Sequence, residues 1–292
     1  QVIRCTIATM KLLLALYFFI LATIQLGLLF GINHYYRSHK SVKPSAYWMA
    51  SLTTSIFALS TFGVGILLNK SGTENPEFNF TIANTLFYIA AILQGLFCYS
   101  LNSEITKKIK IAYISSFVAF FILFEVMRQY STFEMRTIFM CIVTSFLYAW
   151  QIYELSRKRK HVPSRQLQYL QYASSGEMCF AICRLTILVS LSFTIRRLDE
   201  LPQVLILFTI MQLVMNTLSY IAISSYWSEQ IAKSNMRSIL ENEEIRSLLN
   251  EREKLIASLL VANKTAATGA LSAAIAHELN QPLSAISNYC MG

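Results

Sequence analysis

The chain has 292 residues, of which 54% are hydrophobic and only 14% are charged, and its formal net charge is +9. About a quarter of the residues of a soluble domain are charged, so this composition excludes a soluble globular protein and predicts a membrane protein. The positive charge favours basic cytoplasmic loops over nucleic-acid binding, and we expect no nucleic-acid partner.

Seven apolar runs follow one another along the first part of the chain. Each is near the roughly 20 residues that a helix needs to cross a bilayer, and the first is too long for a cleavable signal peptide. We therefore expect an all-α fold in which residues 1–227 form a transmembrane domain, a seven-helix bundle in contact with membrane lipids. The predicted spans are residues 9–33, 46–68, 79–101, 109–128, 134–155, 170–196 and 202–227.

The positions of Lys and Arg predict the orientation of this bundle. Eleven of them lie in the first, third and fifth loops, against seven on the other side. Short loops rich in Lys and Arg stay in the cytoplasm, so the N-terminus is expected outside and the C-terminus, after an odd number of spans, inside. The eleven are Arg37, Lys40, Lys43, Lys107, Lys108, Lys110, Arg157, Lys158, Arg159, Lys160 and Arg165.

Several polar residues lie inside the predicted spans, where they are costly and usually face a cavity or a partner. Arg184 and Glu177 are seven residues apart on one face of the sixth span. One interpretation is a polar ligand pocket among the third, fourth, sixth and seventh spans. The other is a structural ion pair of Arg184 with Glu177 or with Glu125. The candidate ligand-binding residues are Arg184, Gln212, Asn216, Glu125, Glu177 and Gln94.

The cysteines do not indicate a metal site. Cys179 and Cys183 lie one turn apart on one helix face, but no further ligands accompany them. Cysteines inside apolar runs are typical of small buried hydrophobic residues. We therefore predict no metal site in this chain.

The composition changes at residue 228, and residues 228–264 are charged and contain neither Gly nor Pro. Their apolar residues are mostly three or four apart, an imperfect heptad pattern that is interrupted near Glu243. This pattern favours a parallel two-stranded coiled coil over a lone solvated helix. The apolar positions are Met236, Ile239, Ile245, Leu248, Leu255, Leu259 and Ala262.

The C-terminal stretch is rich in Ala and predicts a helix that displays one imidazole. Its apolar seam, at helical spacing, consists of Leu271, Ile275, Leu279 and Ile286. His277 is two residues from the seam on either side, about 200° around the helix, and should face solvent. A neutral imidazole is a nucleophile, and an adjacent carboxylate can hold its second ring nitrogen.

The sequence Ala-His-Glu-Leu-Asn-Gln-Pro-Leu at residues 276–283 resembles the phosphoacceptor motif, the H-box, of sensor histidine kinases. The Ser-Ala-Ile that follows matches one large subgroup of that family. The resemblance implies that His277 accepts the γ-phosphoryl group of ATP and that Glu278 acts as base or orienter. It also implies that Gln281 positions water for dephosphorylation. A His-Glu-x-x-His metalloprotease site is excluded, because position 281 is Gln.

The resemblance also implies partners and a location. Residues 1–227 would be its transmembrane sensor domain and residues 228–264 its coiled-coil signalling linker. Residues 265–292 would begin a dimerisation and histidine phosphotransfer domain, as the first helix of its hairpin. The protein would be a homodimer in the bacterial inner membrane that passes its phosphoryl group to an aspartate of a response regulator. We expect ATP and Mg²⁺ on a catalytic domain in a continuation of the chain or in another chain, and no cofactor within this sequence.

Two functions of different classes follow. In the first, a transmembrane sensor histidine kinase detects a signal in its membrane bundle, such as a small molecule, and thereby controls phosphorylation of His277. The alternative is a transporter or channel-like protein with a dimerising cytoplasmic helix. Transporters usually show internal repeats and broken helices. No repeat is found here, and the prolines lie mainly in loops or at span ends, which disfavours the alternative.

Overall fold

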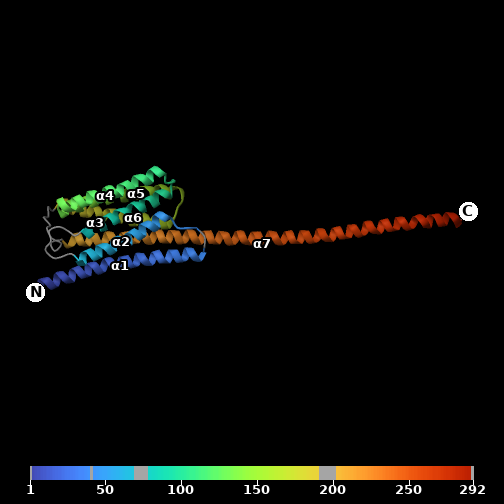
Figure 1. Cartoon of the computed structure of the whole chain (residues 1–292), viewed down its shortest axis with the longest axis horizontal. Coiled ribbons are helices and arrows are strands. Elements are labelled where there is room, and N and C mark those ends of the chain that lie inside the picture. The colour runs from blue at the N-terminus through green and yellow to red at the C-terminus, as the bar shows by residue number, and fades with distance from the viewer. Residues whose placement is uncertain (1, 40–41, 69–77, 191–201, 291–292) are drawn as a thin grey trace. The chain divides into compact units, whose positions relative to one another are not determined.

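The computed structural model describes residues 2–39, 42–68, 78–190 and 202–290, and every structural statement below concerns these residues. They form helices and no strand (Figure 1), which confirms the predicted all-α fold class. The helices are α1 (Val2–His39), α2 (Ala46–Leu68), α3 (Phe78–Ser100), α4 (Lys107–Tyr130), α5 (Phe133–His161), α6 (Arg165–Ser190) and α7 (Gln203–Cys290).

All seven described helices are long and apolar enough to cross a membrane. Each predicted span overlaps one of them, although residues 191–196, the end of the sixth, lie outside the described residues. Most of the loop predicted between the second and third spans, and the loop predicted between the sixth and seventh, lie outside them as well. Several helices are longer than the predicted spans, because their polar end residues continue the helix beyond the apolar stretch.

Threonine side chains fix where two of the helices begin. Thr106 precedes α4 and accepts a hydrogen bond from the backbone N–H of Ile109, and Thr132 precedes α5 and accepts one from Met135. Such caps satisfy N–H groups that have no partner within the helix. The turn between α4 and α5 is therefore short and has defined ends.

The described chain divides into two compact units, residues 1–232 and 233–292. In the first unit α2 packs against α1 and α3, α5 packs against α6 and α3, and α4 packs mainly against α3. The largest apolar core joins most of these helices to the first part of α7. Its bulkiest fully buried side chains are Trp48, Phe97 and Tyr220.

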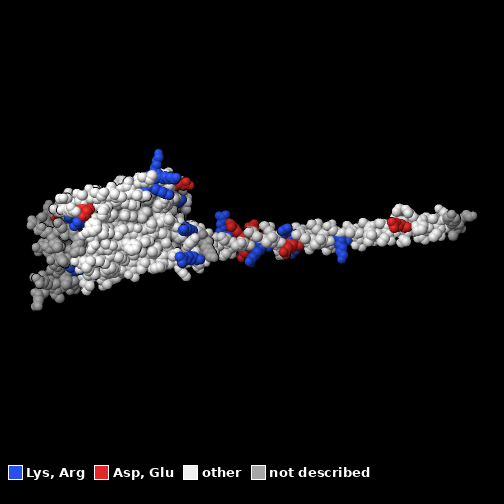
Figure 2. Space-filling view, viewed as in Figure 1, with Lys and Arg blue, Asp and Glu red and all other residues white. Residues whose placement is uncertain are grey.

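Basic side chains gather at the end of the first unit that carries the α3–α4 and α5–α6 connections (Figure 2). Polar contacts join these two connections. Lys158 Nζ donates to the carbonyl of Leu101 at 2.7 Å, and Asn102 Nδ2 donates to the carbonyl and to Oε2 of Glu154, each at 2.8 Å. Glu154 is buried, so this end of the unit is held by specific hydrogen bonds as well as by apolar packing.

The second unit is described as helix from Lys233 to Cys290, the C-terminal part of α7. The helix continues through Pro282. Large apolar side chains are exposed along it, and they include the residues of both predicted seams, for example Leu248 at 57%, Leu255 at 58% and Leu279 at 58% exposure. An exposed apolar stripe of this length is typical of a surface that binds a partner.

Candidate functional site

His277 is exposed on α7, in the second unit. The side-chain nitrogen of Gln281, one turn further on, lies 3.4 Å from Nε2 of the imidazole. Residues four apart share a helix face, so the helix itself brings these two groups together. When the amide donates to Nε2, the ring proton is on Nδ1. A rotated amide can instead hold a water molecule beside the ring.

Glu278 follows His277 directly and is exposed. Adjacent side chains on a helix point about 100° apart, and within the described residues this carboxylate makes no hydrogen bond to the ring. Its role as base or orienter therefore remains a prediction. Pro282 has no backbone N–H, so the carbonyl of Glu278 lacks its usual helical partner. The helix is locally weakened directly after the histidine.

A second group of polar side chains lies inside the first unit, between α5, α6 and α7. Glu177 of α6 is fully buried. Its carboxylate accepts hydrogen bonds from Ser219 Oγ at 2.5 Å and from Asn216 Nδ2 at 3.0 Å. Tyr148, on α5, is buried and lies beside the same carboxylate.

Arg184 lies two turns further along α6 and donates from Nη1 to Oε1 of Gln212 at 2.8 Å. Four of the six candidate ligand-binding residues, two from α6 and two from α7, thus form neighbouring polar contacts. Neither ion pair that we considered from the sequence, Arg184 with Glu177 or with Glu125, is formed among the described residues. The sixth and seventh spans are joined by hydrogen bonds instead.

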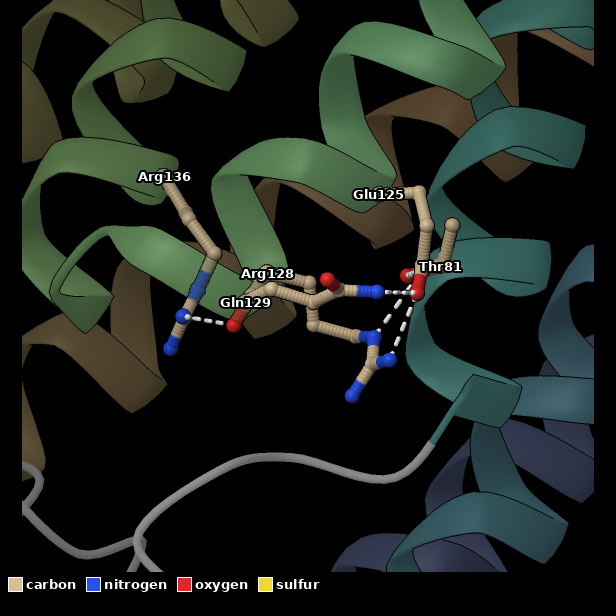
Figure 3. A network of polar contacts seen from close by, with 5 residues as sticks. All are labelled: Thr81, Glu125, Arg128, Gln129 and Arg136. Atoms are coloured by element: carbon tan, nitrogen blue, oxygen red, sulfur yellow. Dashed lines mark hydrogen bonds and ion pairs between the residues drawn. The ribbon is translucent and has the colours of Figure 1, made fainter.

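Glu125 belongs to a different cluster, between α3 and α4 (Figure 3). Its two carboxylate oxygens pair with Arg128, with Oε1 at 2.6 Å from Nη2 and Oε2 at 2.9 Å from Nε. Thr81 and Gln129 also donate to this carboxylate, at 2.8 and 3.0 Å. A carboxylate with this many donors has its hydrogen-bonding capacity well satisfied. Glu125 therefore links α4 to α3 through Thr81.

Arg136 completes this cluster from α5 and is only 9% exposed. Its Nη1 donates to the carbonyls of Ser131 and Arg128, at 2.7 and 3.2 Å. These carbonyls lie at the C-terminal end of α4, where a cation is favourable to the helix dipole. Arg136 therefore caps α4 and fixes the turn between α4 and α5.

The sixth candidate, Gln94 on α3, is buried, and its side-chain nitrogen has no hydrogen bond within the described residues. It makes no hydrogen bond to the other five candidates. Sequence reasoning missed Ser219 and Tyr148. Ser219 could have been found, because it lies three and seven residues after two of the candidates on one face of α7. Tyr148 has no comparable spacing signal.

Helix α7 also makes polar contacts with the first two helices. Gln25 Nε2 of α1 donates to Thr217 Oγ1 at 3.2 Å, and the hydroxyl of Tyr220 is hydrogen-bonded to Ser51 Oγ of α2 at 2.9 Å. The first part of α7 is thus hydrogen-bonded to α1, α2 and α6 within about one and a half turns.

Comparisons of the chain with protein-family models, with characterised proteins and with solved structures find no match.

Proposed function

We propose that this chain is the sensor and phosphoacceptor part of a bacterial membrane histidine kinase. The observation that carries the proposal is His277 itself. It is an exposed imidazole within a sequence that resembles an H-box, with the amide of Gln281 beside Nε2. The same helix, α7, begins with an apolar stretch long enough to cross a membrane. Such a helix gives a signal in the membrane a covalent route to the histidine.

In the proposed reaction, Nε2 of His277 attacks the γ-phosphorus of ATP. The bond from that phosphorus to the bridging oxygen breaks, ADP leaves, and a base removes the proton from Nδ1. Glu278 is the proposed base or orienter, and Gln281 the proposed holder of the water that later hydrolyses the phosphohistidine. The phosphoryl group otherwise passes to an aspartate of a response regulator.

ATP and Mg²⁺ are assigned to a catalytic domain outside this sequence. Mg²⁺ neutralises charge on the phosphates during phosphoryl transfer. The described residues contain no group of three or more His, Cys, Asp or Glu side chains that could hold a metal ion.

Signal input is proposed in the first unit, at the polar contacts of α7. A stimulus, such as a small molecule that binds near Arg184 and Glu177, changes the hydrogen bonds of Gln212, Asn216 and Ser219. The exposed apolar residues of the second unit are proposed to pair with those of a second copy, as a parallel coiled coil. A change in α7 then alters how His277 meets the catalytic domain.

The test is phosphorylation of the chain in lipid nanodiscs, after fusion to the second hairpin helix and the ATP-binding domain of a histidine kinase. With radiolabelled ATP, we expect an acid-labile, base-stable phosphoryl group on the wild type and none on His277→Gln. The matched control is His161→Gln, which removes another exposed histidine and should keep the label. Equal labelling of His277→Gln and the wild type would contradict the proposal.

A further inference from the structure

Glu177 is a carboxyl group in an apolar stretch of α6 and has no cation beside it. It is fully buried, its hydrogen-bond partners are the neutral side chains of Ser219 and Asn216, and the neutral phenol of Tyr148 lies beside it. An isolated ionised carboxylate in such surroundings is very costly, and the group takes up a proton or a counter-ion instead. The fold supplies no counter-ion to Glu177 within the described residues.

The other charged and titratable groups around Glu177 do not supply the missing counter-ion. On its own helix the nearest cation is Arg184, seven residues away, and its guanidinium donates to Gln212. On α5 the titratable neighbour is Tyr148, and on α7 it is Tyr220, whose hydroxyl is hydrogen-bonded to Ser51 of α2. Both are buried phenols and remain neutral donors. The side chain of α1 that is hydrogen-bonded to this part of α7 is Gln25, a neutral amide.

We propose that Glu177 is a proton-binding site, and that uptake and release of this proton is an input signal of the sensor. The proposal rests on the proposed function for its consequence at His277, but not for the site itself. Release moves the proton from the carboxyl oxygen to water and leaves a carboxylate. Uptake reverses this transfer, so atoms and charge balance without a further reactant.

Both protonation states fit the same partners with different hydrogen-bond directions. The carboxylate accepts from the amide nitrogen of Asn216, as in the structure. A protonated carboxyl group can donate, and the amide must then turn to present its oxygen. Ser219 can donate to the other carboxylate oxygen in both states. Protonation thus acts on a side chain of α7 and changes the link between α6 and α7.

The site is tested directly by infrared difference spectroscopy of the 292-residue chain in lipid nanodiscs. The buffer is changed from about pH 5 to about pH 9, the range in which buried carboxyl groups titrate. We expect loss of the carbonyl stretch of a protonated carboxyl group in the wild type, and absence of this change in Glu177→Gln. The control is Glu154→Gln, which removes another buried carboxylate and should keep the change. Identical spectra of the wild type and Glu177→Gln would overturn the proposal.

The consequence for signalling is tested separately, with the kinase fusion described above. Labelling of His277 should depend on pH in the wild type and lose that dependence in Glu177→Gln, whose amide mimics the neutral carboxyl group. A spectral change without any labelling of His277 would leave the proton site standing and contradict the proposed function. Labelling with the same pH dependence in both proteins would show that the proton at Glu177 is not an input signal.

Discussion

A single glycine allows three helices to meet. Gly95 of α3 faces the indole ring of Trp150 on α5, and a Cβ atom built at Gly95 would lie 2.5 Å from a ring carbon. The indole cannot easily move, because it stacks on Tyr113 of α4 with the ring centroids 5.9 Å apart. Packing at this density leaves no room for an added methyl group.

We therefore expect Gly95→Ala to destabilise the first unit by about 1–3 kcal/mol, the usual cost of overpacking. The matched control is Gly27→Ala, because nothing lies within 4 Å of a Cβ atom at Gly27. Thermal unfolding of both variants in detergent, followed by circular dichroism, should show a lower midpoint for Gly95→Ala alone. Equal midpoints would mean that the indole ring of Trp150 shifts to accommodate the added methyl group without a loss of stability.

Some features of individual residues could be predicted from the sequence and others could not. The angle between His277 and the apolar seam follows from the sequence, because a helix fixes the relative directions of its side chains. In the second unit both faces are exposed, Ile275 and Leu279 as well as His277. The separation of Glu125 from Glu177 does not follow. It depends on which helices are neighbours and on how each rotates about its axis, and the apolar runs carry little information on either. The capping role of Arg136 depends likewise on a turn between two helices.

Among the elements, α7 carries both the polar contacts of the first unit and the sequence that resembles a phosphoacceptor motif. The helix was expected from its parts, an apolar run, a charged stretch without Gly or Pro and an Ala-rich end. Its exposed apolar residues are mostly three or four apart, as a coiled-coil seam requires. If α7 pairs with a second copy, the phase of this seam sets the face that His277 presents.

This dependence on phase predicts different outcomes for two deletions in the kinase fusion. Removal of Ser247–Glu253, a whole heptad, keeps the phase within about 20° and should keep signal-dependent labelling of His277. Removal of Ser247–Asn250 shifts the phase by about 40° for a 3.6-residue period and interrupts the seam. This variant should be locked on or off.

The measurement is labelling of His277 in both deletion variants, with and without the stimulus. A change of pH, which acts on the proton at Glu177, can serve as the stimulus. Circular dichroism of both deletion variants controls for loss of the helix itself. Normal responses in both deletions would show that the charged stretch is a loose tether and would contradict the coiled-coil interpretation.

At the scale of the whole molecule, the arrangement in a membrane is the prediction on which the others depend. The alternation of seven apolar helices could be predicted, because the width of a bilayer dictates the length of each run. The side of the membrane on which each loop lies can be predicted only from charge. Basic residues do gather at one end of the first unit (Figure 2). We propose that this end faces the cytoplasm, together with His277.

Helix α4 offers a test of this orientation with one crossing. Lys108 near its start and Tyr130 at its end are both exposed, and 22 residues of helix place them about 33 Å apart, enough to span the hydrocarbon core. Each is changed to Cys in a variant without the native cysteines. An impermeant maleimide should label Tyr130→Cys in intact cells, and Lys108→Cys only after the cells are opened. The reverse pattern would invert the predicted orientation, with the N-terminus in the cytoplasm and His277 outside. Labelling of both variants in intact cells would show that α4 does not cross the membrane.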